Sequence, residues 1–169
     1  MVEFSSREHL QPSLLDRLTD NAPDQTREGS DNQVLSMSQL RQSVLRDLSW
    51  LFATTRLEVV TTEDLPPYAA KSVINYGLPG FTGLSQASER SSGLEAAITE
   101  AIRTFEPRIL SETLRVRLRG KDDDLADGAL VFEIQGELWA QPVPVRIILQ
   151  TTIDPQTQAA AVVESRNRG

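Results

Sequence analysis

The chain has 169 residues, of which 39% are hydrophobic and 24% are charged, and its formal net charge is −7. This length and composition fit one globular domain with room for a polar tail. The acidic balance argues against general affinity for nucleic acid or anionic lipid. The absence of cysteine excludes disulfides, thiolate catalysis and cysteine-bound zinc.

The sequence contains no signal for membrane insertion or export. No apolar run approaches the roughly 20 residues that cross a bilayer. The first ten residues, MVEFSSREHL, lack the basic start and apolar block of a signal peptide. We therefore expect a cytoplasmic protein with no direct membrane insertion.

Residues 1–35 hold seven acidic residues and three arginines and are predicted to form a flexible acidic segment. Inside it, residues 12–20 (PSLLDRLTD) form an apolar island in which Leu14, Leu15 and Leu18 have helical spacing. The island is either a docking segment for a partner or a single turn packed on its own domain. The sequence leaves both interpretations open.

The first long helix is predicted over residues 37–54. Ser36 and Gln39 fit a capping box, in which each side chain satisfies a free amide at the helix start. The apolar face consists of Leu40, Val44, Leu48, Leu51 and Phe52, while Arg41, Arg46 and Asp47 are predicted to be turned away from it.

A second, shorter helix is predicted within EDLPPYAAKSVINYG. Pro66 or Pro67 would lie in its first turn, where a missing amide hydrogen costs nothing, and Gly77 would end it. The glycine- and serine-rich stretch LPGFTGLSQASERSS then predicts a loop.

The third predicted helix begins at a second capping box, made by Ser92 and Glu95. It ends before Pro107, because proline disfavours helical geometry in the residue before it and donates no amide hydrogen. Its apolar stripe consists of Leu94, Ala97, Ile98, Ala101, Ile102 and Phe105.

After Pro107 the hydrophobic period changes from 3.6 to 2, which predicts strands over residues 114–119, 130–138, 143–153 and 159–164. Arginines of the first strand are expected to pair with Glu133 and Glu137 across the outer face. Residues 36–165 are therefore predicted to form an α+β domain. About three N-terminal helices would pack on one face of a mainly antiparallel sheet of three to four strands.

Few residues fit a catalytic or metal site, and we expect no catalytic residue, metal or cofactor. The acidic run Asp122, Asp123, Asp124 and Asp127 lacks the ligand spacing of an EF-hand loop. His9 is the only histidine, so a histidine-based metal cluster is excluded. GLPGFTG does not follow a strand and lacks the lysine of a phosphate-binding loop.

Glu106 is the one carboxylate whose position suggests chemistry, because it lies at the C-terminal end of a predicted helix. The helix dipole there disfavours its anion, whereas the neighbouring Arg108 favours it. A glycosidase needs a second carboxylate across the scissile bond, and no other acid is singled out by the pattern. A structural ion pair or a partner contact is favoured over catalysis.

Four segments, in this order, carry a family resemblance: PSLLDRLTD, SVLRDLSWLFATTR, AAKSVINYGLPG and LEAAITEAIRTFEPRI. The chain resembles the TssE family, the baseplate wedge subunits of bacterial type VI secretion systems. These subunits are part of a wider baseplate wedge family of contractile phage tails that is often labelled lysozyme-related. The resemblance extends from Pro12 to about Glu164.

The resemblance implies an α+β fold like that of contractile-sheath subunits and a structural role without enzymatic activity. The protein would join the wedge subunits TssF and TssG in a baseplate that also contains TssK and docks on the inner-membrane complex. The baseplate would seed polymerisation of the TssB–TssC sheath. The family's Glu-Pro-Arg signature corresponds to Glu106, Pro107 and Arg108 and implies an assembly contact.

Two further hypotheses follow from the sequence. The C-terminal strands, near residues 145–164, alternate without obvious edge-blocking lysines and are expected to accept a strand from a sheath subunit. The alternatives to a secretion-system scaffold are a peptidoglycan-cleaving, lysozyme-like hydrolase with Glu106 as its acid, or the equivalent wedge subunit of a phage-tail-like particle.

Overall fold

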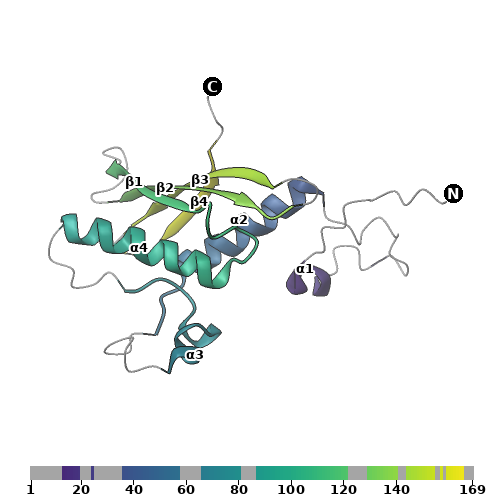
Figure 1. Ribbon diagram of the computed structural model, residues 1–169, viewed down its shortest axis with the longest axis horizontal. Coiled ribbons are helices and arrows are strands. Elements are labelled where there is room, and N and C mark those ends of the chain that lie inside the picture. Colours follow the sequence, from purple (N-terminus) through teal and green to yellow (C-terminus); the bar gives the residue numbers. More distant parts are fainter. Residues whose placement is uncertain are drawn as a thin grey trace.

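Two long helices lie on one side of a four-stranded sheet in the computed structural model (Figure 1). The predicted α+β class is confirmed. The structure describes residues 13–19, 24, 36–57, 66–80, 87–121, 129–140, 144–154, 157 and 159–165. Predictions for His9, for the acidic run Asp122–Asp127 and for the linker on either side of Asp24 lie outside these residues.

The sheet is an antiparallel meander whose strand order, β1-β2-β3-β4, follows the sequence. The strands are β1 Arg115–Lys121, β2 Leu130–Leu138, β3 Val145–Ile153 and β4 Ala160–Glu164. Each lies within about two residues of its predicted bounds. Alternating burial along β2 and β3 confirms that one face of the sheet is turned to the core.

The outer face of the sheet carries one of the expected ion pairs. Arg119 Nε donates to Glu133 Oε2 at 2.7 Å. This hydrogen bond, together with the arginine charge, holds the pKa of Glu133 below its usual value. None of the ion pairs in the described part of the chain includes Glu137, so that half of the prediction is wrong.

Helix α2 spans Met37–Ala53, one residue shorter than predicted. The predicted capping box is present: Ser36 Oγ accepts from Gln39 N, and Gln39 Oε1 accepts from Ser36 N at 2.8 Å. All five apolar residues predicted for its inner face are buried, namely Leu40, Val44, Leu48, Leu51 and Phe52.

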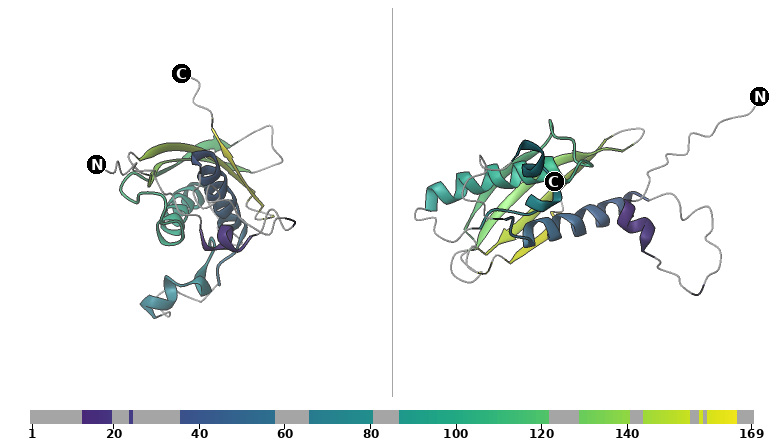
Figure 2. Two further views of the ribbon diagram at one scale, coloured as in Figure 1. Left: turned by 90° about the vertical axis from the view of Figure 1, so that its right-hand side faces the viewer. Right: turned by 90° about the horizontal axis from the view of Figure 1, so that it is seen from below.

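The core lies between the two helices and the inner face of the sheet. Helix α2 contacts β4 and helix α4 contacts β1, so the two long helices cover different halves of the same face of the sheet (Figures 1 and 2). The hydrophobic residues with no exposed surface are Leu48, Ile98, Ile102, Phe132, Ile134, Leu138 and Ile153. Burying large apolar side chains of this kind contributes about 1.5–3 kcal/mol each.

Helix α4 spans Ala87–Phe105 and ends where Pro107 predicted. Its predicted beginning at Ser92 is wrong, because the helix starts five residues earlier. The Glu95 side chain therefore does not complete a capping box. It instead accepts a hydrogen bond from Leu118 N on β1 at 2.6 Å.

The second predicted helix is also wrong in length. It is replaced by a four-residue helix, α3 Pro67–Ala70, and a 3-10 turn, η3 Val73–Asn75. Only two helices, not three, contribute to the layer beneath the sheet. Isolated short helices are marginal in water unless an apolar face packs, and the apolar side chains here do not pack: Tyr68 is 92% exposed and Val73 80%.

Residues 66–75 form an arm that extends away from the sheet (Figures 1 and 2). Its root is fixed where residues Thr54–Arg56 pass Leu78: Leu78 N donates to Thr54 O, and Arg56 N donates to Leu78 O, both at 2.8 Å. Gly77 allows this approach with a φ of +115°, a conformation that side chains rarely adopt.

We expect Gly77→Ala to destabilise the domain. A Cβ at this position would lie 2.3 Å from Thr54 O, and the backbone strain alone costs about 1–3 kcal/mol. Urea unfolding measures the change. Gly93→Ala is the matched control, because a Cβ there meets nothing within 4 Å beyond its chain neighbours and the backbone of its own helix, and a helical alanine stabilises by about 0.5–1 kcal/mol. Equal stabilities for the two variants would contradict this account.

Candidate functional site

Glu106, Pro107 and Arg108 connect α4 to the sheet. Glu106 N makes the last helical hydrogen bond, to Ile102 O at 2.8 Å, and the chain then turns. On the other side of the turn, Trp139 N donates to Arg108 O at 2.7 Å, which attaches the turn to the end of β2. We call residues 106–110 the helix–sheet joint.

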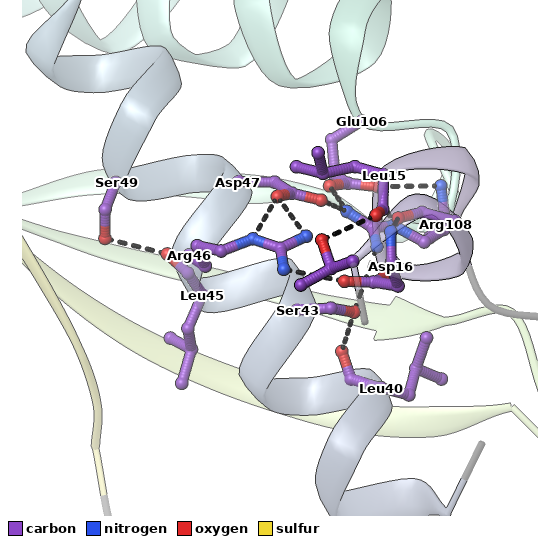
Figure 3. Close-up of polar contacts among 12 residues, drawn as sticks. Leu15, Asp16, Leu40, Ser43, Leu45, Arg46, Asp47, Ser49, Glu106 and Arg108 are labelled. Carbon is purple, nitrogen blue, oxygen red and sulfur yellow. Dashed lines mark hydrogen bonds and ion pairs between the residues drawn. The ribbon is translucent and has the colours of Figure 1, made fainter. Parts of the chain in front are cut away.

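The Arg108 guanidinium binds the Glu106 carboxylate as a fork (Figure 3). Nε donates to Glu106 Oε1 at 2.6 Å and Nη2 donates to Oε2 at 2.5 Å. The Glu106 side chain is only 3% exposed. The ion pair therefore lies within the chain, and Arg108 neutralises a carboxylate that would be costly to bury alone.

Helix α2 supplies the remaining partners of Arg108. Asp47 Oδ2 lies 2.5 Å from Nη2, and Ser43 Oγ accepts from Nη1 at 3.1 Å. Asp47 lies off the apolar face, as predicted, but it is only half-buried and its carboxylate binds Arg108, a side chain that follows it by 61 residues. Burial opposes the charged form of Arg108, but the hydrogen bonds and charges of Glu106 and Asp47 outweigh it and raise its pKa.

The same aspartate links the joint to the N-terminal island. Asp47 Oδ1 also pairs with Arg46 at 2.8 Å, and Arg46 Nη1 lies 2.6 Å from Asp16 Oδ1 on α1 Leu14–Leu18. The order Asp16–Arg46–Asp47–Arg108–Glu106 alternates in charge, and we call it the ion-pair chain (Figure 3). Sequence patterning did not identify Asp16, Arg46 or Ser43 as part of a site, since their partners are distant in the chain.

Helix α1 is held by polar contacts and not by its leucines. Ser13 caps it, and its only ion pair in the described residues is that of Asp16. Leu14 is 71% exposed, Leu18 74% and Leu15 43%. The leucines that suggested a docking segment therefore remain available, as do the apolar residues of the arm.

The geometry offers little for catalysis. The Glu106 carboxylate is enclosed and both its oxygens are bound by Arg108, whereas a glycosidase acid must reach a scissile bond. Among the described side chains, no group of three histidine, cysteine or acidic residues could hold a metal ion. The arrangement serves to fix a turn between two layers.

The family model for Baseplate wedge protein gp25 matches residues 38–143, which include all but the first residue of α2, the joint and β2. The chain belongs to this baseplate wedge family. Comparisons with curated proteins and with solved structures gave no match. The wedge family is structural, and its members assemble with other baseplate proteins.

In this wedge protein no helix of the described residues is long and apolar enough to cross a membrane.

The family match includes Glu106, Pro107 and Arg108, but it begins after α1 and ends before β3. The leucines of α1 and the strands β3 and β4 therefore lie outside it.

We expect Arg108→Ala to lower the free energy of unfolding by about 3 kcal/mol or more, because it leaves the buried Glu106 carboxylate without its partner. Chemical denaturation measures the change. Glu164→Gln, which breaks the exposed Arg41–Glu164 pair at 3.1 Å, is the control and should cost less than about 1 kcal/mol. Similar small losses in both variants would show that the buried pair is not a structural requirement.

Helix α1 should detach at acid pH. Burial alone would raise the pKa of Asp16, but hydrogen bonds from Ser13 and Arg46 and the arginine charge hold it below its usual value of 3.8. A lowered pKa contributes stability that is complete above 3.8 and is lost as pH falls through the folded-state pKa. The attachment should therefore persist at pH 5 and disappear below 3.8.

The Trp50 indole signal in NMR can report this transition, because the Arg46 guanidinium carbon lies 5.1 Å from the Trp50 ring centroid. The free energy lost on detachment should be small, since the Asp16–Arg46 pair is partly exposed. Asp16→Asn is the control and should abolish this component of the titration. A midpoint above 3.8 would contradict the account.

Proposed function

We propose that this wedge protein is the TssE subunit of a bacterial type VI secretion system. It joins TssF and TssG in the wedge, in a cytoplasmic baseplate that contains TssK and docks on the inner-membrane complex. The observation that carries the proposal is the family match over residues 38–143. The leading PSLLDRLTD island and the SVINYGLPG segment favour this branch of the family over a phage-tail-like particle.

The exposed apolar side chains support a role in assembly. Leu14 and Leu18 of α1 and Tyr68, Val73 and Ile74 of the arm are largely exposed, and clustered exposed apolar residues mark protein interaction sites. Both elements are attached to the domain, α1 through the Asp16–Arg46 ion pair and the arm through the backbone hydrogen bonds at Leu78. Attachment before binding lowers the entropy lost when a partner binds.

We also propose that the joint contacts a wedge partner. Pro107 is exposed, and the Arg108 side chain keeps 22% of its surface accessible. Glu106 would then act by orienting Arg108. Co-purification of Arg108→Ala with partners, measured below its unfolding transition, separates a lost contact from lost stability.

The sheath contact is proposed at the C-terminal strands. β4 is an edge strand of the meander, so its outer main-chain groups are available to a strand from TssB or TssC. The lysozyme-like alternative is not favoured, because Glu106 is enclosed and bound on both oxygens.

The proposal is tested by co-purification with TssF and TssG. We expect Leu14→Ser/Leu18→Ser to weaken the complex about tenfold or more, as for an apolar anchor at an interface, without a change in melting temperature. Leu57→Ser is the matched control, because Leu57 is an exposed leucine outside α1. Unchanged co-purification of the double variant would remove α1 from the interface, and failure of the wild-type protein to bind would overturn the proposal.

A further inference from the structure

The sheet has two edges, and the structure treats them differently. In an antiparallel ladder, main-chain groups face alternately toward and away from the neighbouring strand. On β1, the main-chain groups of Leu118 and Val116 point away from β2, because Leu118 N donates to a side chain outside the sheet. Ser165 N, just after β4, donates to Ile148 O on β3. The main-chain groups of Val162 and Glu164 therefore point away from β3.

One outward amide of β1, that of Leu118, is already occupied. Glu95, on α4, accepts from Leu118 N at 2.6 Å across 23 residues of sequence. A carboxylate is a strong acceptor, and displacing it would leave a partly buried charge without a partner. A register shift between Leu118 and Gly120 further interrupts this edge.

The side chains of the two edge strands also make β1 the less suitable edge for strand pairing. Arg115, Arg117 and Arg119 on β1 are exposed, and charged side chains on an edge discourage strand pairing. β4 has the sequence AAVVE, with small and β-branched residues and one acid. Within the described part of the chain, no side chain donates to or accepts from the outward main-chain groups of β4.

Space alone does not close the β1 edge. An open groove separates β1 from α4 and is lined by Glu95, Ala96, Thr99, Glu100, Arg103 and Val116. An extended segment lying in this groove would need the Leu118 amide for its main-chain pairing. The edge is therefore closed chiefly by the hydrogen bond of one side chain.

We infer that Glu95 is a specificity-determining residue for strand addition. It closes the β1 edge, so that an extended segment of a sheath subunit can be added only beside β4. This inference rests on the proposed sheath contact at the C-terminal strands. One-sided addition gives the assembly a direction, because two open edges would allow copies to join β1 to β4 in an open-ended series.

The test uses the isolated full-length protein and hydrogen exchange. In the wild-type protein, the Leu118 amide should exchange about tenfold or more slowly than the Val116 amide, which faces the same groove. Glu95→Ala should remove this protection, whereas Glu95→Gln should retain it, because its amide oxygen can accept the same hydrogen bond. Equal exchange of Leu118 and Val116 in the wild-type protein would overturn the inference, even if Glu95→Ala does not fold.

Sedimentation velocity supplies the second measurement. Glu95→Ala should form oligomers whose size grows with protein concentration. The sedimentation coefficients of the wild type and of Glu95→Gln should not change with concentration. Adding Val163→Lys to Glu95→Ala should suppress the oligomers, because Val163 is exposed on β4 and an edge lysine discourages pairing. A folded Glu95→Ala with wild-type sedimentation would contradict the inference.

The proposed sheath contact at β4 is tested by a separate result. If Val163→Lys alone leaves sheath assembly intact, the proposed contact at β4 is wrong, whatever the exchange and sedimentation of the Glu95 variants show.

Discussion

The structure depends on the position of one guanidinium between two carboxylates. Arg108 binds Glu106 at the end of α4 and Asp47 on α2, while its own carbonyl is bonded to the end of β2. It therefore joins both helices of the lower layer to the sheet. Because Glu106 is buried, its charge must be matched, and the fork geometry of arginine matches it with two parallel bonds.

The ion-pair chain also determines how the N-terminal island is presented. Asp47 is shared by Arg108 and Arg46, and Arg46 holds Asp16 on α1. The island is thus attached through the polar side of a helix whose leucines are turned outward. A polar attachment of this kind leaves an apolar surface free for a partner, which a hydrophobic attachment would have consumed.

The regular elements follow from local pattern. The helix face of α2, the stop at Pro107 and the four alternating strands were predictable because each depends on residues a few positions apart. The arm was not predicted correctly, since its helical pattern has no surface on which to pack. The beginning of α4 was missed because the Ser92–Glu95 pattern imitates a capping box within a helix that starts at Ala87.

The sequence by itself determined the α+β class, the helix–strand boundary at Pro107 and the adjacency of Glu106 and Arg108. Only the tertiary structure decided what that adjacency does: it is completed by Asp47 and Ser43, which lie more than 60 residues earlier. The role of Glu95 was decided in the same way, by an amide 23 residues later. Periodicity records which side chains face the core, whereas ion pairs and edge contacts depend on which elements the packed core brings together.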